Sequence, residues 1–459
     1  MGDNIVYTRW VVYFVFGLPF LAWLFFTKSN VLRVISVLAV LIFIQNSISA
    51  RRYLWAIGVG PSNIVAYVAL ISLFLQRKGR LSLQGIGIPW AFYLFLAFAG
   101  LLIGATRPGE LLWNVIAFQE YYVEGFFFFL IGVVAFTKDE ELDQFFTYFV
   151  MIGIGVAVIH LFCLATGFHF VDWAQAGEVD SALPYGGVFN NPNTMGSFYC
   201  MVLPTALLMA ANGRNPVAQR TIASAGLVLM LGSLLISTHR GGILVCGFLF
   251  VMMLLLNSAN PARGLVAIVF GAVALAVGIL VLRELIPDLV DEAVGMQEYE
   301  GLSTSRLWIW TSYLTIIAQH PFGVGVTTKA VLDTAAKYNI PFAPHNVYLG
   351  IAMQIGILGL IMFLIMAGVS LARGFRAWRI TREPRRRLVL TYVFIAQIGW
   401  LLAGISETLF ENGYKMNQLY WFFLGLSLAT SGRVLAEARR GGASQQAPVA
   451  LEEATAHGL

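Results

Sequence analysis

The sequence predicts an all-α, polytopic membrane protein with about 12 transmembrane helices. Of its 459 residues, 58% are hydrophobic and only 12% are charged, which is about half the charge of a soluble domain. The mean hydropathy is +0.76. Apolar runs long enough to cross a bilayer recur along most of the chain, so we expect lipid rather than water around most of its surface.

Thirteen apolar runs are candidate spans. They lie at about 10–27, 31–48, 54–75, 88–105, 112–136, 143–168, 194–212, 217–237, 241–257, 264–283, 345–372, 388–409 and 416–431. The first three are short or polar, which leaves twelve or thirteen crossings open. The first run lacks a small-residue cleavage site, so we interpret it as a retained helix rather than a signal peptide.

Two long irregular stretches and a terminal tail divide the chain into six segments. Transmembrane helices are expected in 1–168, 194–283 and 345–431, with loops at 169–193 and 284–344 between them. A helix beginning at Arg306 is expected inside the larger loop. The composition of the tail, 432–459, predicts disorder.

Orientation follows from the basic residues. Segment 373–387 carries Arg373, Arg376, Arg379, Arg382, Arg385, Arg386 and Arg387. Short loops of this kind stay in the cytoplasm, so the acidic loop 284–344, one crossing away, faces the other side together with 169–193. Twelve spans place the amino terminus inside. Thirteen would leave Arg51 and Arg52 outside, against the rule, which favours twelve.

Three residues on that outer side stand at expected helix starts. Arg240 lies in Ser-Thr-His-Arg-Gly-Gly, Arg306 follows a Ser/Thr run that predicts an N-cap, and His345 begins a long span. Free N–H groups and a positive dipole end favour anions at such starts. We therefore interpret the three residues as a cradle for a polyanion, diphosphate above all. The alternatives are arginines that extend to lipid headgroups and a structural histidine.

The remaining polar residues are less specific. Glu120 and Glu124 lie four residues apart on one helical face and could bind a substrate hydroxyl if they face a cavity. Near the outer edge they would be solvated, which we prefer for Glu120; Glu407 and Glu411 are interpreted in the same way. The histidines interpreted as structural are His160, His169, His239 and His320.

Several chemistries have no motif in the chain. A nucleotide-binding Gly-x-x-x-x-Gly-Lys-Ser/Thr loop is missing, and no His-x-x-x-His or Asp-x-Asp pattern marks a metal site. Acids at 288–292 are interpreted as solvated. The three cysteines lie in apolar runs, typical of small core residues. We expect no cofactor, metal, nucleotide or nucleic-acid partner.

Short motifs on the outer side resemble the O-antigen ligase and polymerase superfamily of bacterial polysaccharide assembly, most closely the ligases. The motifs are Gly187 to Asn193, Ser237 to Gly242, Ser305 to Trp308, His320 to Gly325 and Pro344 to Leu349. Each is weak alone, but their order, spacing and shared side are specific together. The resemblance covers about 185–372 well.

This resemblance implies a glycosyltransferase of the bacterial inner membrane. Such an enzyme passes a glycan from undecaprenyl diphosphate to a sugar of lipid A–core at the periplasmic face. Arg240 and Arg306 would take the family's diphosphate-binding positions and His345 its essential histidine. The acids Glu120 and Glu124 stand where a basic residue is expected, which departs from the family pattern. Further candidate substrate contacts are Asn193, Asn346, Tyr348 and Glu124.

These motifs do not identify the acceptor of the glycan. An O-antigen polymerase and a protein O-oligosaccharyltransferase of the same superfamily are therefore alternatives. From another class, a transporter of polyprenyl-linked sugars would need polar residues along a path that reaches both faces. Here they gather on one face, which favours a reaction site.

Overall fold

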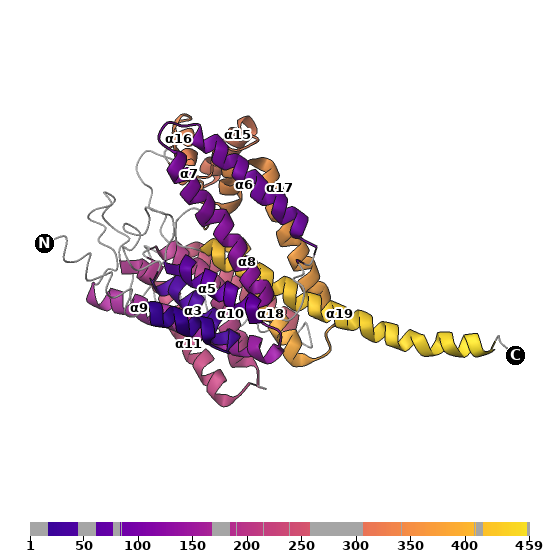
Figure 1. Ribbon diagram of the computed structural model, residues 1–459. Coiled ribbons are helices and arrows are strands. Elements are labelled where there is room, and N and C mark those ends of the chain that lie inside the picture. Colours follow the sequence, from indigo (N-terminus) through magenta and orange to yellow (C-terminus); the bar gives the residue numbers. More distant parts are fainter. Residues whose placement is uncertain are drawn as a thin grey trace.

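The computed structural model describes residues 17–44, 61–76, 83, 85–167, 184–189, 191–213, 215–237, 239–257, 306–340, 342–407, 409 and 416–456. Within these ranges the chain forms helices and turns and no strand, which confirms the all-α prediction (Figure 1). The expected span 264–283 lies outside them, as do Glu411 and the acids at 288–292.

Eight helical segments in these ranges have the length and apolar composition of membrane spans. They are Gly87–Ala105, Leu111–Val134, Asp139–Thr166, Pro192–Ala211, Val217–Ile236, Val347–Ile380, Pro384–Ala403 and Met416–Arg440. Three shorter apolar helices are Asn30–Ile44, Ser62–Gln76 and Arg240–Met253. The polytopic prediction is thereby confirmed.

The element bounds follow the predicted runs closely. In chain order they are α2 (Leu18–Phe26), α3 (Asn30–Ala39), η2 (Val40–Ile44), α5 (Pro61–Gln76), α6 (Gly87–Ala105), α7 (Leu111–Phe118), η4 (Gln119–Val123), α8 (Glu124–Val134), α9 (Asp139–Thr166), η6 (Pro184–Phe189), α10 (Pro192–Ala211), α11 (Val217–Ile236), α12 (Arg240–Asn257), α15 (Arg306–Gln319), α16 (Thr328–Ala336), α17 (Val347–Ile380), α18 (Pro384–Ala403) and α19 (Met416–Ala456). The tail beyond 431, expected to be disordered, continues α19 as helix to Ala456. Its alanines, glutamines and glutamates are good helix formers.

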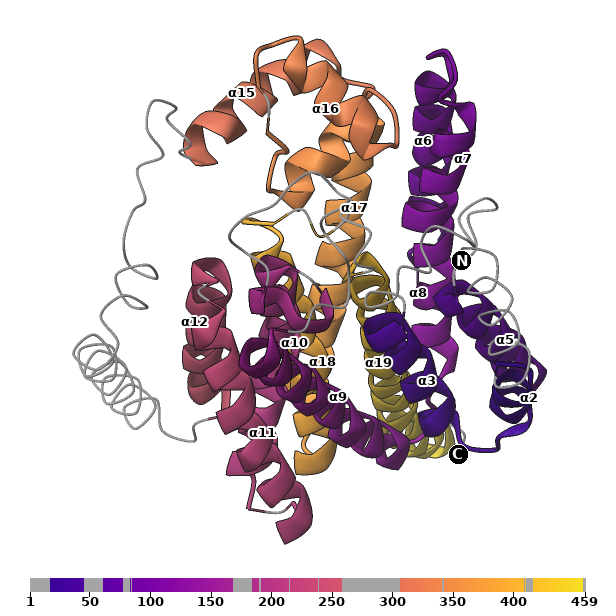
Figure 2. The same cartoon turned by 90° about the vertical axis from the view of Figure 1, so that its left-hand side faces the viewer.

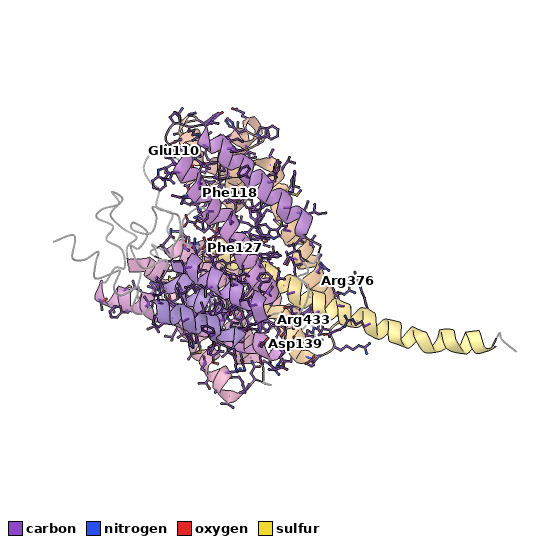
Figure 3. All side chains as sticks on the ribbon, in the orientation of Figure 1. Glu110, Phe118, Phe127, Asp139, Arg376 and Arg433 are labelled. Atoms are coloured by element: carbon purple, nitrogen blue, oxygen red, sulfur yellow. The ribbon has the colours of Figure 1, made fainter. Side chains whose placement is uncertain are left out.

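Basic residues gather at one end of the molecule, opposite Glu110 (Figure 3). There the Nε of Arg386 lies 2.7 Å from an Asp139 oxygen, and Arg433 reaches the other oxygen of the same carboxylate at 3.6 Å. Arg385 pairs with Asp143 at 2.9 Å. These ion pairs join the starts of α9 and α18 to the middle of α19, and we refer to this part of the molecule as the basic end.

Helix α17 is a hairpin rather than a single rod. Gly356 has φ 81° and ψ 174°, a left-handed conformation that glycine adopts without steric cost. The rings of Tyr348 and Phe363 are 6.2 Å apart, although 15 residues of straight helix would separate them by about 22 Å. The chain therefore reverses at Gly356, and a short arm, 347–355, packs against a long arm, 357–380. The predicted continuous span 345–372 is wrong in this respect.

The loop between α15 and α16 covers the turn of this hairpin. Val324 N donates to Met353 O at 2.7 Å, and Ile357 N donates to Pro321 O at 3.0 Å. Backbone N–H and C=O groups that lose their helical partners near Gly356 are thus hydrogen-bonded by the loop. Arg107, in the α6–α7 turn, donates to Val324 O at 3.3 Å and holds α16 in place. Figure 2 shows α15 and α16 stacked beyond the ends of α10, α12 and α18.

Candidate functional site

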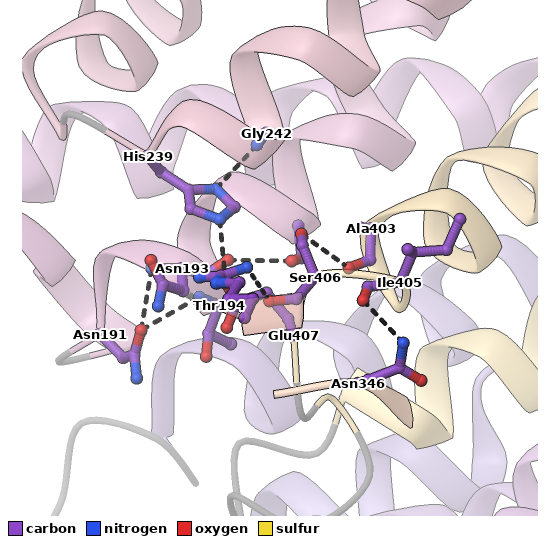
Figure 4. A network of polar contacts seen from close by, with 12 residues as sticks. Asn191, Asn193, Thr194, His239, Gly242, Asn346, Ala403, Ile405, Ser406 and Glu407 are labelled. Carbon is purple, nitrogen blue, oxygen red and sulfur yellow. Dashed lines mark hydrogen bonds and ion pairs between the residues drawn. The ribbon is translucent and has the colours of Figure 1, made fainter. Parts of the chain in front are cut away.

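Five segments meet around Glu407, a carboxylate just beyond the end of α18. They are the starts of α10, α12, α15 and α17 and the end of α18. In Figure 4, Asn191 and Asn193 lie on one side of His239 and Glu407, and Asn346 lies on the other. Glu407 is only 3% exposed. A buried carboxylate is stable only with partners, and the converging segments supply them.

Arg306 is the first of these partners. Its NH2 group lies 3.3 Å from Oε1 of Glu407, and its NH1 donates to the carbonyl oxygen of Ser406. A guanidinium has five N–H donors, so these two contacts leave others for a ligand. The side chain is 43% exposed. The Ser/Thr run expected to cap this helix, 303–305, lies outside the described residues.

His239 is the second partner, and the sequence did not single it out. Its Nε2 lies 3.3 Å from Oε1 of Glu407, and its Nδ1 accepts a hydrogen bond from the amide of Gly242 at 3.1 Å. A ring nitrogen that accepts carries no proton, so this geometry assigns the proton to Nε2, which donates to the carboxylate.

The ring of His239 lies in a slot between α10 and α12. A Cβ on Gly196 would overlap Nδ1 of the ring, and one on Gly242 would lie 2.6 Å from it. Glycine is therefore required for this close approach. Gly241 and Gly242, which follow His239 closely in the sequence, are the signal that could have revealed a tightly packed ring at this position.

Two predictions about acids are wrong. Glu407 and Glu120 were expected to be solvated, but both are buried, at 3% and 7% exposure. Glu407 can be buried because Arg306 balances its charge and His239 donates a hydrogen bond to it, and both residues come from distant segments. Glu120 lies on the π-helical turn η4 and packs toward α16 rather than toward water.

His345 precedes α17 in an unusual conformation. Its φ is 43°, a left-handed backbone that few residues other than glycine adopt. Burial lowers the pKa of its imidazole, and Arg306 lowers it further, while Glu407 acts in the opposite direction. Its Nδ1 is buried and has no hydrogen-bond partner among the residues described. At neutral pH the side chain is therefore a neutral imidazole next to a guanidinium and a carboxylate.

The start of α17 does not offer the open N–H groups that the sequence analysis expected. Oδ1 of Asn346 accepts from the amides of Tyr348 and Leu349 at 2.9 and 3.1 Å. The amide of Val347 donates to Gly404 O at 2.8 Å. Asn346 also donates to Ile405 O at 2.9 Å. These contacts tie the hairpin to the end of α18 and occupy the helix start.

The other candidate residues occupy different positions. Arg240 is exposed at the start of α12, and a Cβ on the adjacent Gly241 would lie 2.7 Å from Oγ of Ser406. Tyr348 donates its hydroxyl proton to Leu401 O at 2.6 Å. Glu124 is fully buried between α8 and α19, where it accepts from Nε2 of Gln418 at 3.1 Å. Glu124 thus lies apart from Glu407, Ser406, Arg306 and His239, which together form the Glu407 cluster.

A family model described as O-antigen ligase matches residues 225–364. The O-antigen ligase of Pseudomonas aeruginosa (strain PAO1) is 28% identical over 255 residues. The predicted resemblance to the O-antigen ligase family is confirmed. The match covers 53% of this chain and 55% of that relative, so it spans about half of each protein.

The O-antigen ligase model includes three of the converging segments. Arg240, Arg306 and His345 all lie within 225–364, as does His239. Glu407 lies beyond the matched range. In the described part of the chain, no three His, Cys, Asp or Glu side chains are grouped as metal ligands.

Proposed function

We propose that this protein is a membrane glycosyltransferase of the O-antigen ligase type. It moves a glycan from undecaprenyl diphosphate to a sugar hydroxyl of lipid A–core, at the periplasmic face of the bacterial inner membrane. The observation that carries the proposal is that Arg306 and His239 both contact the buried carboxylate of Glu407, while Asn346, the neighbour of His345, binds the carbonyl of Ile405 close by. This arrangement combines a cation for a leaving group with a neutral base.

Arg306 and Arg240 bind the diphosphate of the donor. Glu407 and Ser406 fix the guanidinium of Arg306 by two contacts, and its remaining N–H groups face the donor. Planar guanidinium groups bind phosphate oxygens in a bidentate manner. The positive charge of the two arginines offsets the negative charge that develops on the diphosphate as its bond to the sugar breaks. The sugar–diphosphate bond itself supplies the energy for the transfer.

His345 is the general base in this proposal. Its lowered pKa keeps it unprotonated at neutral pH, able to take the proton of the acceptor hydroxyl. The hydroxyl oxygen then attacks the anomeric carbon and the diphosphate departs, which inverts the configuration. Glu407 stabilises the imidazolium that forms. A positioned base typically contributes about 10²–10⁴ in rate.

The remaining candidates have supporting roles. Asn193 contacts substrate from the start of α10, beside the cluster in Figure 4. Asn346 and Tyr348 position His345, because their side chains bind the end of α18 at Ile405 and Leu401. Glu124 is not included among the substrate contacts, because it is fully buried and accepts a hydrogen bond from Gln418. We further propose that no metal takes part.

One experiment tests the reaction. Purified protein is given undecaprenyl-diphosphate-linked glycan in the presence of EDTA, with lipid A–core, free glycan or a serine-containing peptide as acceptor. Transfer to lipid A–core is the expected result. Extension of free glycan would indicate a polymerase, and peptide modification a protein oligosaccharyltransferase. No covalent product with any acceptor, together with movement of the donor across a vesicle membrane, would indicate a transporter.

A further inference from the structure

A pocket of about 270 Å³ opens between α7, the π-helical turn η4 and the start of α16. It contains none of the residues of the Glu407 cluster. Its walls carry two carboxylates, two aromatic rings, two threonines and one lysine. The carboxylates are Glu110 and Glu120, the aromatic residues are Trp113 and Tyr121, and the lysine is Lys329.

The polar groups of this pocket come from both walls. Nζ of Lys329, on α16, lies 3.3 Å from Oε1 of Glu110 at the start of α7 and 2.6 Å from Asp333. Asp333 and then Glu110 raise the pKa of Lys329, so it stays a cation. Glu120 is 7% exposed. Among the described side chains that line the pocket, the carboxylates of Glu110 and Glu120 outnumber the one cation, Lys329, so the lining carries more negative than positive charge.

The π-helical turn shapes the inner wall. Such turns insert one extra residue into a helix and are frequent at functional sites. Here the turn directs Glu120 and Tyr121 to the pocket. Its backbone is held by α19, because Asn417 Nδ2 donates to Tyr121 O at 3.1 Å and Gln418 Nε2 donates to Glu120 O at 3.0 Å. Arg107 holds the opposite wall through Thr334 at 3.1 Å. Both walls are thus fixed before any ligand arrives.

This set of groups fits a sugar ring. Carboxylates accept strong hydrogen bonds from hydroxyl and ammonium groups. Aromatic faces such as those of Trp113 and Tyr121 pack against the apolar face of a ring. The excess negative charge of the pocket lining repels sugars that carry phosphate or carboxylate, so the pocket selects against acidic sugars.

The outer side of α7 indicates how the sugar arrives. Leu111, Leu112 and Trp113 are each more than half exposed, and Val115 is 44% exposed. These apolar side chains follow the pocket wall along a helix that belongs to a membrane span. Lipid chains can lie along this face while a polar headgroup enters the pocket.

We propose that this pocket binds a neutral or amino sugar in the headgroup of a membrane-anchored saccharide. The assignment of that saccharide to a substrate rests on the proposed function, in which both donor and acceptor are lipid-anchored. Binding itself does not depend on that function.

Saturation-transfer NMR on the full-length protein in detergent tests binding. The probes are methyl glucoside, methyl glucosaminide and methyl glucuronide. We expect signals from the first two and none from the glucuronide. Trp113→Ala should remove them, and Glu120→Gln should weaken the glucosaminide most. Trp23→Ala is the matched control, because Trp23 is 45% exposed on α2, away from the pocket. Wild-type signals in Trp113→Ala, or equal binding of the glucuronide, would overturn the proposal.

Transfer kinetics then identify the source of the sugar. Trp113→Ala should raise the KM for one substrate roughly three- to tenfold, the loss expected for one aromatic contact, with kcat little changed. A rise for lipid A–core assigns the pocket to the acceptor, and a rise for the donor assigns it to the lipid-linked glycan. Unchanged KM for both would contradict a substrate role. If the wild type transfers nothing, the proposed function fails while the NMR result still decides the sugar site.

Discussion

His239 donates from Nε2 to Oε1 of Glu407 across 3.3 Å, and the same carboxylate oxygen lies 3.3 Å from Arg306. Glu407, just beyond α18, thereby holds two side chains at once. His239 comes from the start of α12 and Arg306 from the start of α15. The position of the Arg306 guanidinium therefore depends on His239 as well as on Glu407.

Removing the ring of His239 should disturb Arg306. We expect His239→Ala to lower transfer about tenfold or more, because a hydrogen bond to a charged group is worth roughly 1.5–3 kcal/mol. His239→Gln should retain most activity, since its amide can still donate to Glu407. Donor affinity and single-turnover rate are the measurements. Equal activity of the alanine variant and wild type would show that Arg306 is positioned without His239.

The glycine slot gives an independent test of the same contact. Gly196→Ala should reduce transfer and lower the melting temperature, because its methyl group would overlap the His239 ring. Gly232→Ala is the control: on α11 nothing lies within 4 Å of the added methyl, and alanine favours helix. Thermal unfolding in detergent and transfer are measured for both. A neutral Gly196→Ala would mean that the ring can leave the slot freely.

Lysine cannot replace Arg306. Arg306→Lys should lose most activity, because an ammonium is a point charge and cannot hold Ser406, Glu407 and phosphate oxygens at once. We expect the same direction for Arg240→Lys. Arg220→Lys, at an exposed position on α11, should behave as wild type. Full activity in both test variants would identify these arginines as membrane anchors.

The acidity of His345 sets the pH dependence. Its pKa lies below the ordinary value of 6.5, chiefly through burial. A base with a lowered pKa stays deprotonated further into acid, so the acid limb of the pH–rate profile should fall below 6.5. His345→Ala should lose about 10²–10⁴ in rate with donor affinity nearly unchanged. Activity that rises on acidification would instead make the imidazolium a phosphate contact.

Orientation can be tested with cysteines, because the three natural ones are buried. Lys337→Cys, exposed after α16, should react with an impermeant maleimide in intact spheroplasts. Arg385→Cys, exposed at the basic end, should react only after the membrane is opened. The reverse pattern would move the Glu407 cluster to the cytoplasmic side.

The span pattern could be predicted because about 20 apolar residues are needed for each crossing. Arg240, Arg306 and His345 could be proposed as site residues because polar and charged side chains are costly near a membrane. The reversal at Gly356 could not, because the sequence is apolar on both sides and a lone glycine is a weak signal. The burial of Glu407 could not either, since its partners lie 101 and 168 residues away. Arg33 is also fully buried, but its partners are local, because the carbonyl oxygens of Leu24 and Thr27 accept its hydrogen bonds.

The hairpin of α17 has a consequence for the chemistry. Arg306 begins α15, the loop after α15 binds the hairpin turn at Gly356, and the short arm leads back to His345. Arg306 and His345, the proposed cation for the leaving group and the proposed base, are thus the two ends of one hydrogen-bonded frame within 306–356. Both ends of the frame are also tied to the end of α18, through Glu407 for Arg306 and through Ile405 for Asn346, so the two residues are held together as one unit. Changes in membrane thickness should therefore alter how substrates reach the site, while the geometry between the two reacting groups stays constant.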